Sequence, residues 1–437
     1  MSSSVSSTTD PTSTRVPEHD GPIYVTRRCF GMGTCRNIAP ELFGEVPTES
    51  DTAPGGASVL PGSFETGSHT GVLSQPQDAD DFADARDAAK LCPMSAIRLR
   101  PRRPSSSTGE RGSTPRSWPR RLEEEVWAVG HPSSKNIGAT VYFVERPGGG
   151  ILVDLPEPSE ALFEWLDAHG GVRWIFITHR DHASHHRAFS ERFPGCERVI
   201  GTEDVVTRPR SDFYAATADV EVMVNVGAGL TALDGTPIPE EELPQAECVV
   251  IPQPGHTPGS LCLLYRNRYL FTGDHLVYSR LHGAIEASRL VCWDDWKLQT
   301  ESVRMLAEWA KAGRIRFDWL LPGHLEWHHF TPDGDSAGAV ALERTVEWMA
   351  HQPPGRTSLF SWVPFIFLRT RPQSSLARAL RLIGGREDDT WVLPRAVRRY
   401  IRDHDPAAAR AATRRVYAIA AAALGGFTAL IGLVLLA

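Results

Sequence analysis

Histidine and aspartate residues are concentrated in four short segments of this 437-residue chain. Neutral imidazoles and carboxylates are groups that bind zinc and iron in proteins. The segments are far apart in the sequence, so only a folded chain could bring their ligands together. We therefore predict a metal site, formed by segments 178–186, 254–259, 271–275 and 321–324.

In each of these segments, a short apolar run that is typical of a β-strand precedes the candidate ligand. A strand end is rigid enough to hold a ligand in place, and four ligands at four strand ends would surround one pocket. The ligands predicted in this way are His179 after 174–177, His256 after 248–251, Asp274 after 269–271 and His324 after 319–321.

The first segment holds four histidines within eight residues, which favours a ligand role over a surface or core role. If the segment is helical beyond His182, then His185 and His186 lie on the same face as His182, and at least one of them can reach the pocket. Asp181 is a further candidate ligand, and the sequence leaves open which of these residues bind.

Together, the segments resemble the metallo-β-lactamase-fold superfamily over about residues 124–350. The marks of the resemblance are Thr178-His179, Gly255 to Ser260, Thr272-Gly273-Asp274 and Pro322-Gly323-His324. The resemblance implies an αββα sandwich that carries metals along one edge of two packed sheets. It also implies that His256, Asp274 and His324 are ligands and that the aspartate bridges two metals.

The first motif departs from the His-x-His-x-Asp-His pattern of that family. In strict register from His179, Asp181 replaces the second histidine, Ala183 the aspartate and Ser184 the last histidine. In relatives, the missing aspartate orients water and helps to hold the second metal. A site with one metal, or with iron, is therefore an alternative to a site with two zinc ions.

A turn two residues longer would place His185 and His186 where the family has its Asp-His pair. Asp181 or His182 would then be the other ligand. We prefer this longer turn, in which His185 changes the charge and basicity beside the metal.

A metal ion in such a pocket lowers the pKa of a bound water to about 7 and polarises an ester, thioester or lactam carbonyl. We therefore expect a hydrolase that acts on a small molecule, with Asp181 and His185 as catalytic residues.

The N-terminal part has a different set of candidate ligands. The segment from Cys29 to Cys35, followed by Cys92-Pro93, resembles a bacterial single-cluster ferredoxin over most of residues 21–100. Cysteine thiolates hold iron-sulfur clusters in such proteins. Met32 stands where 4Fe-4S members have a cysteine, so the resemblance favours a 3Fe-4S cluster on three cysteines. The alternatives are a 4Fe-4S cluster with another fourth ligand and a domain without a cluster.

The composition divides the chain into further parts. We predict a disordered tail at 1–20, a ferredoxin-like α+β domain at 21–101, a Pro/Ser/Arg-rich linker at 102–121 and the metallo-β-lactamase-fold domain at 122–354. Residues 355–415 contain 13 Arg, no Lys and 5 acidic residues, although the whole chain has a net charge of −7. This basic segment is expected either to lie on anionic lipid or to pack on the catalytic domain.

The last 22 residues, 416–437, contain no charged side chain. As a helix they would span roughly 33 Å, about the hydrocarbon core of a bilayer. Arg414 and Arg415 precede this segment and place the preceding chain on the cytoplasmic side. We predict a single C-terminal transmembrane anchor in the cytoplasmic membrane.

Two other functions are consistent with the sequence. In one, the cluster supplies electrons, received from a redox partner protein, to iron at the histidine–aspartate site. In the other, the chain is a non-catalytic electron-transfer or redox-sensing protein. Nucleic-acid binding is not expected, because the Arg-rich part has neither interleaved aromatic residues nor a recognised module.

Overall fold

The computed structural model describes residues 21–26, 29, 31–47, 68–92, 96–100, 118–136, 138–208, 215–280, 282–288, 292–330 and 337–351. The predicted tail, the basic segment and the membrane anchor lie outside these residues, as does most of the predicted linker. Among the described residues, none of the helices combines the length and the apolar character that crossing a membrane requires.

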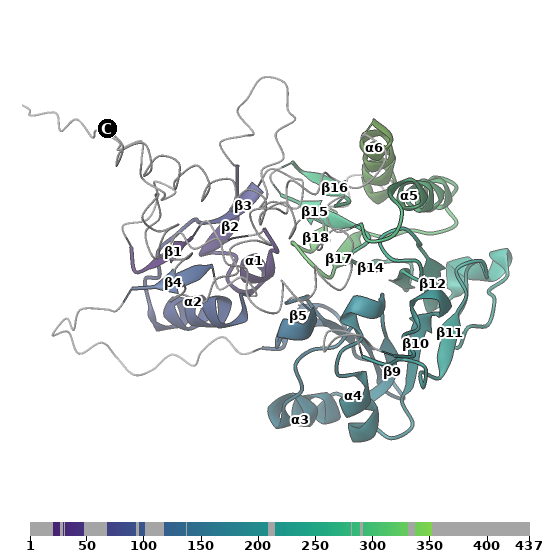
Figure 1. Cartoon of the computed structure of the whole chain (residues 1–437), viewed down its shortest axis with the longest axis horizontal. Helices are drawn as coiled ribbons and strands as arrows, with labels where there is room; N and C mark the ends of the chain where they lie inside the picture. Colours follow the sequence, from purple (N-terminus) through teal and green to yellow (C-terminus); the bar gives the residue numbers. More distant parts are fainter. Residues whose placement is uncertain are drawn as a thin grey trace, which may run out of the picture.

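A small α+β domain forms the first part of the structure and lies beside a larger domain (Figure 1). Strand β1 (Ile23–Val25) pairs antiparallel with β4 (Ile97–Leu99), and β2 (Phe43–Pro47) pairs antiparallel with β3 (Ser68–Val72). The helices are α1 (Thr34–Ile38) and α2 (Ala79–Leu91). Helix α2 begins at a cap, because the Asp78 carboxylate accepts a hydrogen bond from the Asp81 amide. The structure thus has an α+β domain where one was predicted, whereas the ferredoxin resemblance stays a prediction.

The larger domain begins at β5, two residues before the predicted start, and its first sheet has seven strands in the order β11-β10-β9-β8-β7-β6-β5. The pairs from β8 to β11 are parallel and the others are antiparallel. The strands are β5 (Arg120–Glu123), β6 (Val126–Ala128), β7 (Tyr142–Val144), β8 (Gly150–Val153), β9 (Val172–Phe176), β10 (Glu197–Gly201) and β11 (Val222–Val224).

The second sheet has five strands in the order β12-β13-β14-β17-β18. Only the β14–β17 pair within this sheet is parallel. A separate hairpin, β15 (Val277–Ser279) with β16 (Ala284–Glu286), follows β14. The strands of the sheet are β12 (Cys248–Pro252), β13 (Leu261–Tyr265), β14 (Tyr269–Gly273), β17 (Trp319–Pro322) and β18 (His328–His329).

The two sheets pack face to face, and helices cover both outer faces. Alternation along the strands shows this: Val153 and Leu263 lie in the cluster between the sheets, whereas Leu152 and Leu264 lie in the outer clusters. The cover of the first sheet is α3 (Glu160–Ala168) and α4 (His186–Arg192), and that of the second is α5 (Trp296–Lys311) and α6 (Ala337–His351).

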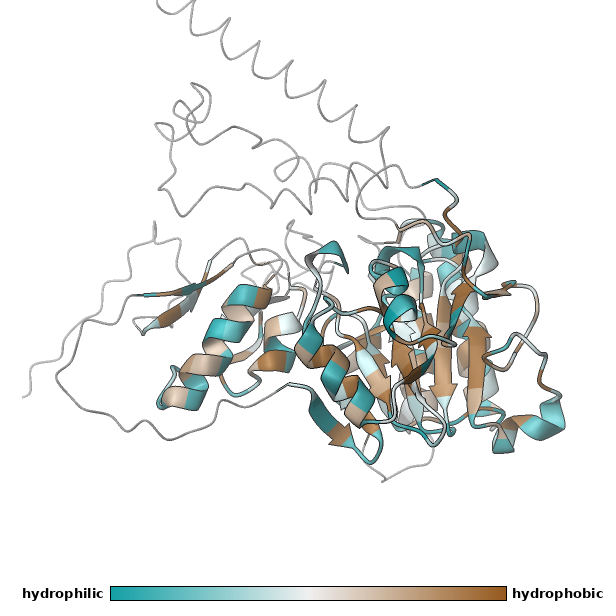
Figure 2. Cartoon of the chain, turned by 90° about the horizontal axis from the view of Figure 1, so that it is seen from below, coloured by the Kyte–Doolittle hydropathy of each residue, from teal (hydrophilic) through white to brown (hydrophobic). Residues whose placement is uncertain are grey.

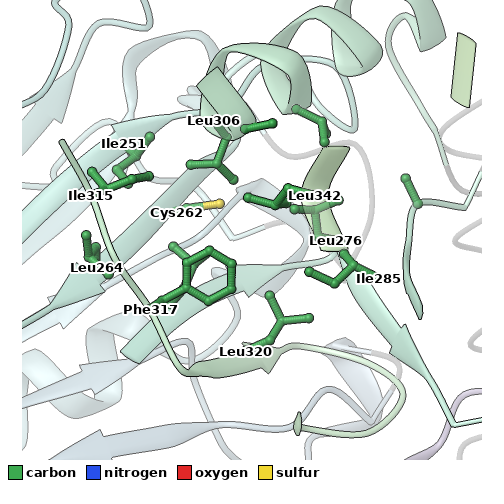
Figure 3. Packing of buried hydrophobic residues seen from close by; sticks show 14 of the residues in the cluster. Ile251, Cys262, Leu264, Leu276, Ile285, Leu306, Ile315, Phe317, Leu320 and Leu342 are labelled. Carbon is green, nitrogen blue, oxygen red and sulfur yellow. The ribbon is translucent and has the colours of Figure 1, made fainter. Parts of the chain in front are cut away.

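The outer clusters bury the apolar face of each helix. Figure 2 shows hydrophobic strands at the centre and more polar helix surfaces outside. In Figure 3, Leu306 of α5 and Leu342 of α6 pack over Cys262 and Leu320 of the second sheet. The result is a four-layer αββα sandwich, which is the architecture predicted for this part of the chain.

Candidate metal centre

The predicted ligands come together at one edge of the sandwich. Strand β9 ends at Phe176 and leads to His179, and β14 ends at Gly273 and leads to Asp274. His256 follows β12 and His324 follows β17, so both sheets contribute. All four side chains are buried. A short 3₁₀ turn, Arg180–His182, follows His179 directly.

Two overlapping groups of three residues have ligand atoms within 4.8 Å of one another. One group is His179, Asp181 and His256, and the other is His179, His182 and Asp274. The imidazole of His324 joins the second group, because its Nδ1 lies 2.7 Å from Oδ1 of Asp274. The structure therefore brings together four imidazoles and two carboxylates.

The carboxylate of Asp274 lies between two pairs of histidines. Its Oδ1 faces His324 at 2.7 Å and Nε2 of His182 at 3.6 Å. Its Oδ2 faces Nε2 of His179 at 3.8 Å and Nε2 of His256 at 3.9 Å. One carboxylate that directs its two oxygens to different histidine pairs can link two neighbouring ions.

A glycine leaves room for this carboxylate. A Cβ atom at Gly323 would lie 2.7 Å from Oδ1 of Asp274 and 2.8 Å from Cε1 of His182. Any side chain at position 323 would therefore displace a candidate ligand.

Asp154 orients the turn that carries His182. Its Oδ2 lies 2.8 Å from Nδ1 of His182, and its Oδ1 accepts a hydrogen bond from the amide of Thr178 at 2.9 Å. A carboxylate on one ring nitrogen directs the other nitrogen toward a metal and increases the basicity of the imidazole. Asp154 follows β8 directly and lies outside the four segments in which ligands were predicted.

A second carboxylate, Asp204, ties the first ligand turn to the loop of His256. It accepts hydrogen bonds from the amide of Arg180 at 3.0 Å, the hydroxyl of Thr257 at 2.6 Å and the amide of Gly259 at 3.0 Å. The sequence gives no sign of this role, because Asp204 lies in a 3₁₀ turn outside the four segments.

The buried charges shift the pKa values of the candidate ligands in opposite directions. Burial, with help from the neighbouring imidazoles His182 and His256, holds the pKa of His179 well below its ordinary value. Burial would also lower the pKa of His182, but Asp154 and Asp274 outweigh it and raise that pKa to about 9. Burial would raise the pKa of Asp274, yet His324 and His182 hold it well below its ordinary value. Asp274 is therefore a carboxylate, which is the form that binds metal.

The residues fit a zinc or iron ion. Nε2 of His179 is buried and has no hydrogen-bond partner among the described residues. A buried polar atom without a partner is costly, and a metal ion would satisfy it. The set of imidazoles and carboxylates, with Asp154 behind one imidazole, suits either metal.

The structure does not bring His185 and His186 to this centre. Nε2 of His185 lies 3.0 Å from Oγ of Ser133 and 3.3 Å from Oε2 of Glu157. The longer turn that we preferred is therefore not observed: the 3₁₀ turn is short and presents Asp181 and His182 instead.

The histidine that follows is also directed elsewhere. His186 contacts Arg198 through Nδ1 at 2.8 Å and the carbonyl oxygen of Ala216 through Nε2 at 2.9 Å. Both of its ring nitrogens are thus engaged away from the metal centre, because His186 is the first residue of helix α4, which packs on β10.

Other histidines near the ligands have separate surroundings. His275 is buried, and neither of its ring nitrogens has a hydrogen-bond partner among the described residues. Burial lowers its pKa to about 3, so that the imidazole is neutral. His328 stacks on Tyr278 and His329 on Trp319.

The three N-terminal cysteines lie close together in the core of the small domain, and we call this place the cysteine pocket. Cys29 and Cys35 are buried in its core and Cys92 packs against that core. Sγ of Cys29 accepts hydrogen bonds from the amides of Gly31 and Thr70, each at 3.4 Å. Burial and the neighbouring Cys92 and Cys29 raise the pKa of the Cys35 thiol.

Among known proteins, the comparisons found similarity to solved structures only. No protein-family model and no curated protein matches the sequence. Among solved structures, a metallo-beta-lactamase from Pontibacter korlensis is 15% identical and covers 54% of this chain and 99% of its own, with a TM-score of 0.38. A metallo-beta-lactamase superfamily protein from Sulfolobus tokodaii is 15% identical and covers 53% and 89%, with a TM-score of 0.36.

A third similar structure is the mono-zinc form of the metallo-beta-lactamase FIM-1 from Pseudomonas aeruginosa. It is 16% identical, covers 53% of this chain and 95% of its own, and has a TM-score of 0.37. Identities and TM-scores at this level do not bear on the reaction. The strand order, the layers and the ligand geometry define the class: an αββα sandwich with a histidine–aspartate centre at its edge.

Proposed function

We propose that the chain is a metal-dependent hydrolase whose histidine–aspartate centre holds one or two zinc or iron ions. The observation that carries this proposal is the position of Asp274, whose two carboxylate oxygens face different histidine pairs. A bound metal ion supplies a hydroxide nucleophile at neutral pH and polarises the carbonyl of an ester, thioester or lactam bond.

The residues of the centre divide into two sets in this proposal. His179, Asp181 and His256 would hold one ion and His182 and His324 the other, with Asp274 between the two. Asp181, whose Oδ2 lies 3.7 Å from Nε2 of His179, would also position the attacking water and accept its proton. His185 has no part in the reaction, because it contacts Ser133 and Glu157 instead.

We also propose that Cys29, Cys35 and Cys92 hold an iron-sulfur cluster, for which 3Fe-4S is preferred over 4Fe-4S. Backbone amides that donate to cysteine sulfurs are typical of such sites, and Gly31, Thr70 and Ala96 donate in this way. A cluster, unlike a single metal ion, does not require the three cysteine sulfurs to bind the same atom, because each sulfur would bind a different iron atom.

The membrane anchor at 416–437, the basic segment at 355–415 and a body that faces the cytoplasm are proposals from the sequence. They rest on the uncharged C-terminal segment and on the arginines that precede it. Contact with membrane lipid follows from the same two features.

A second candidate function is a redox enzyme. The observation that favours it is a direct contact between the loop from Cys29 to Cys35, which we call the cysteine loop, and the loop of His324. The amide of Leu325 donates a hydrogen bond to the carbonyl of Met32. In this case iron would occupy the centre, the cluster would supply it with electrons, and a redox partner protein would reduce the cluster.

Metal analysis combined with a thioester and lactone assay tests the proposal. The anaerobically purified full chain is expected to contain zinc or iron and to lose turnover when a chelator removes the metal. A folded chain with no metal and no metal-dependent turnover would contradict the proposed hydrolase. Zinc rather than iron at the centre would contradict the redox enzyme.

A further inference from the structure

The hydrophobic core around the cysteines extends into the loop of His324. Leu325, the residue after His324, is buried in the cluster that contains Cys29, Met32 and Cys35. Val277 and Trp293 of the sandwich belong to the same cluster. The core of the small domain is therefore completed by the loop that presents a candidate metal ligand.

Both backbone groups of Leu325 are bound by the small domain, one by the loop between Cys29 and Cys35 and the other by helix α1. Its amide donates to the carbonyl of Met32 at 3.0 Å, and its carbonyl accepts from Nδ2 of Asn37 at 2.7 Å. Leu325 has a φ of 61°, a left-handed conformation that is unfavourable for leucine. The two hydrogen bonds help to hold this conformation, which sets the direction in which the chain leaves His324.

A glycine of the cysteine loop touches the backbone of Leu325. Gly33 has a φ of 77°, and a Cβ atom there would lie 2.3 Å from Cα of Leu325. Only glycine permits both this conformation and this approach. The two loops therefore fit each other at backbone level, beyond the contact of flexible side chains.

The other side of His324 is linked to the same asparagine. The carbonyl of Gly323 accepts a hydrogen bond from the amide of Thr140 at 2.6 Å. The hydroxyl of Thr140 accepts from Nδ2 of Asn37 at 3.0 Å. The side-chain amide of Asn37 thus contacts Leu325, after His324, directly, and is linked to Gly323, before His324, through Thr140.

A buried ion pair reinforces the contact. Nε of Arg36 lies 2.9 Å from Oε1 of Glu326, and both side chains are fully buried. The same guanidinium donates to the carbonyl of Gly31 at 3.1 Å and lies 3.6 Å from Glu45. A charge pair that is buried in this way fixes the geometry of the two loops, because separating it would leave uncompensated charges.

We propose that Met32, Gly33 and Asn37 position His324, so that filling the cysteine pocket strengthens metal binding at the histidine–aspartate centre, and the reverse. This inference rests on the proposed function, since it requires ligands at both places. We call these three residues, with Thr140 and Leu325, the joint. A ligand on Cys29 and Cys35 restrains the loop between them, and the joint passes that restraint to His324.

The physical basis is a shared ordering cost. Whichever site is filled first orders the joint, and the second ligand then binds to loops that are already ordered. The coupling is reciprocal by thermodynamic necessity, so each ligand must strengthen the other by the same factor. Asn37 and Thr140 are positioning residues, because they contact the backbone on either side of His324.

Cobalt titration of the full chain tests the joint without relying on activity. Cobalt bound by imidazoles and carboxylates lacks the thiolate-to-cobalt absorption band, so the two sites are read separately. The cysteine pocket is first filled by anaerobic reconstitution with iron and sulfide. Asn37→Leu is then expected to weaken cobalt binding at the centre about tenfold, the effect typical of losing a residue that holds a metal ligand in position. In the unaltered chain, filling the pocket is expected to tighten that binding about fivefold or more.

Two further variants make the result specific. Asn267→Gly is the control, because Nδ2 of Asn267 also donates to backbone carbonyls, those of Leu243 and Pro244 outside the joint, and glycine adopts the φ of 49° at this position without strain. It is expected to leave cobalt binding unchanged. If Asn37→Leu does not fold, Thr140→Val removes the hydroxyl and keeps the backbone amide, and a weakening of a few-fold is expected.

The outcomes separate the two proposals. If the unaltered chain binds no cobalt, or if all of its bound cobalt shows the thiolate-to-cobalt absorption band, the proposed metal centre is wrong. If it binds cobalt but the joint variants and the filled pocket leave the affinity unchanged, the metal centre stands and the joint is overturned.

Discussion

The histidine–aspartate centre and the cysteine pocket are supported in different ways. The centre takes its residues from the ends of strands in two packed sheets, and Asp154 and Asp204 fix the turns between them. The cysteine pocket lies in a small domain with two-stranded ladders, and its core includes Val277 and Leu325 of the sandwich. A small domain buries too little apolar surface to be stable easily by itself. The pocket therefore depends on its neighbour, whereas the support of the centre comes mainly from within the sandwich.

This difference indicates where each site is vulnerable. Loss of a carboxylate inside the sandwich should damage the centre and leave the cysteines in place. Loss of a thiol should empty the cysteine pocket and affect the centre only through the joint. The predictions below test this asymmetry.

Asp274→Asn should have the largest effect. The amide no longer offers the charged oxygens that face both histidine pairs, and metal ions contribute several kcal/mol of transition-state stabilisation. Metal-dependent turnover should fall by about three orders of magnitude, with iron at the cysteines largely retained. Turnover and metal content, measured beside Asp234→Asn in an exposed turn, check this. Equal turnover in the Asp274→Asn and Asp234→Asn variants would contradict the proposed role of Asp274 at the centre.

Asp154→Asn should have the next largest effect. It keeps the size of the side chain but weakens the interaction that orients His182, and such losses lower metal affinity by about 10–100-fold. Competition with a chelator measures this affinity. Unchanged affinity would mean that the sandwich positions His182 without Asp154.

Cys35→Ser tests the same difference at the cysteine pocket. Serine cannot replace the thiolate, so the electron paramagnetic resonance signal of a cluster at this pocket should be lost. Metal should stay at the centre, and its affinity there should fall about fivefold through the joint. Complete loss of metal from the centre would show that the centre depends on the small domain far more than its hydrogen bonds indicate.

His328→Phe should have the smallest effect. Burial lowers the pKa of His328 to about 4, so below pH 6.5 the unfolded chain binds a proton that the folded chain does not. Stability supplied by the neutral imidazole is therefore lost as the pH falls from about 6.5 to 4. Phenylalanine keeps the stack on Tyr278 and should reduce the fall in melting temperature between pH 7 and pH 5. If the melting temperature of the variant falls between pH 7 and pH 5 as much as that of the unaltered chain, then His328 is protonated in the folded state.

Much of the sandwich could be predicted from the sequence, because its pattern is local. The predicted run 248–251 lies within β12 (Cys248–Pro252), and the run 319–321 lies within β17 (Trp319–Pro322). Strand ends followed by histidine or aspartate then indicated the edge at which the ligands meet.

The first ligand turn could not be predicted in detail. The spacing of its four histidines permits two turn lengths, and a hydrogen bond from the Arg180 amide to Asp204, distant in sequence, helps to select the short one. The position of Asp154 and the contact of Leu325 with Met32 depend on tertiary packing in the same way. Such contacts leave no periodic trace in the sequence.

Anomalous diffraction from crystals of the anaerobically purified chain, measured at the zinc and iron absorption edges, tests the central claim most directly. We predict a peak among the side chains of His179, His256 and Asp274, and for two ions a second peak beside His182 and His324. An ordered centre with no anomalous peak at either edge would contradict the account.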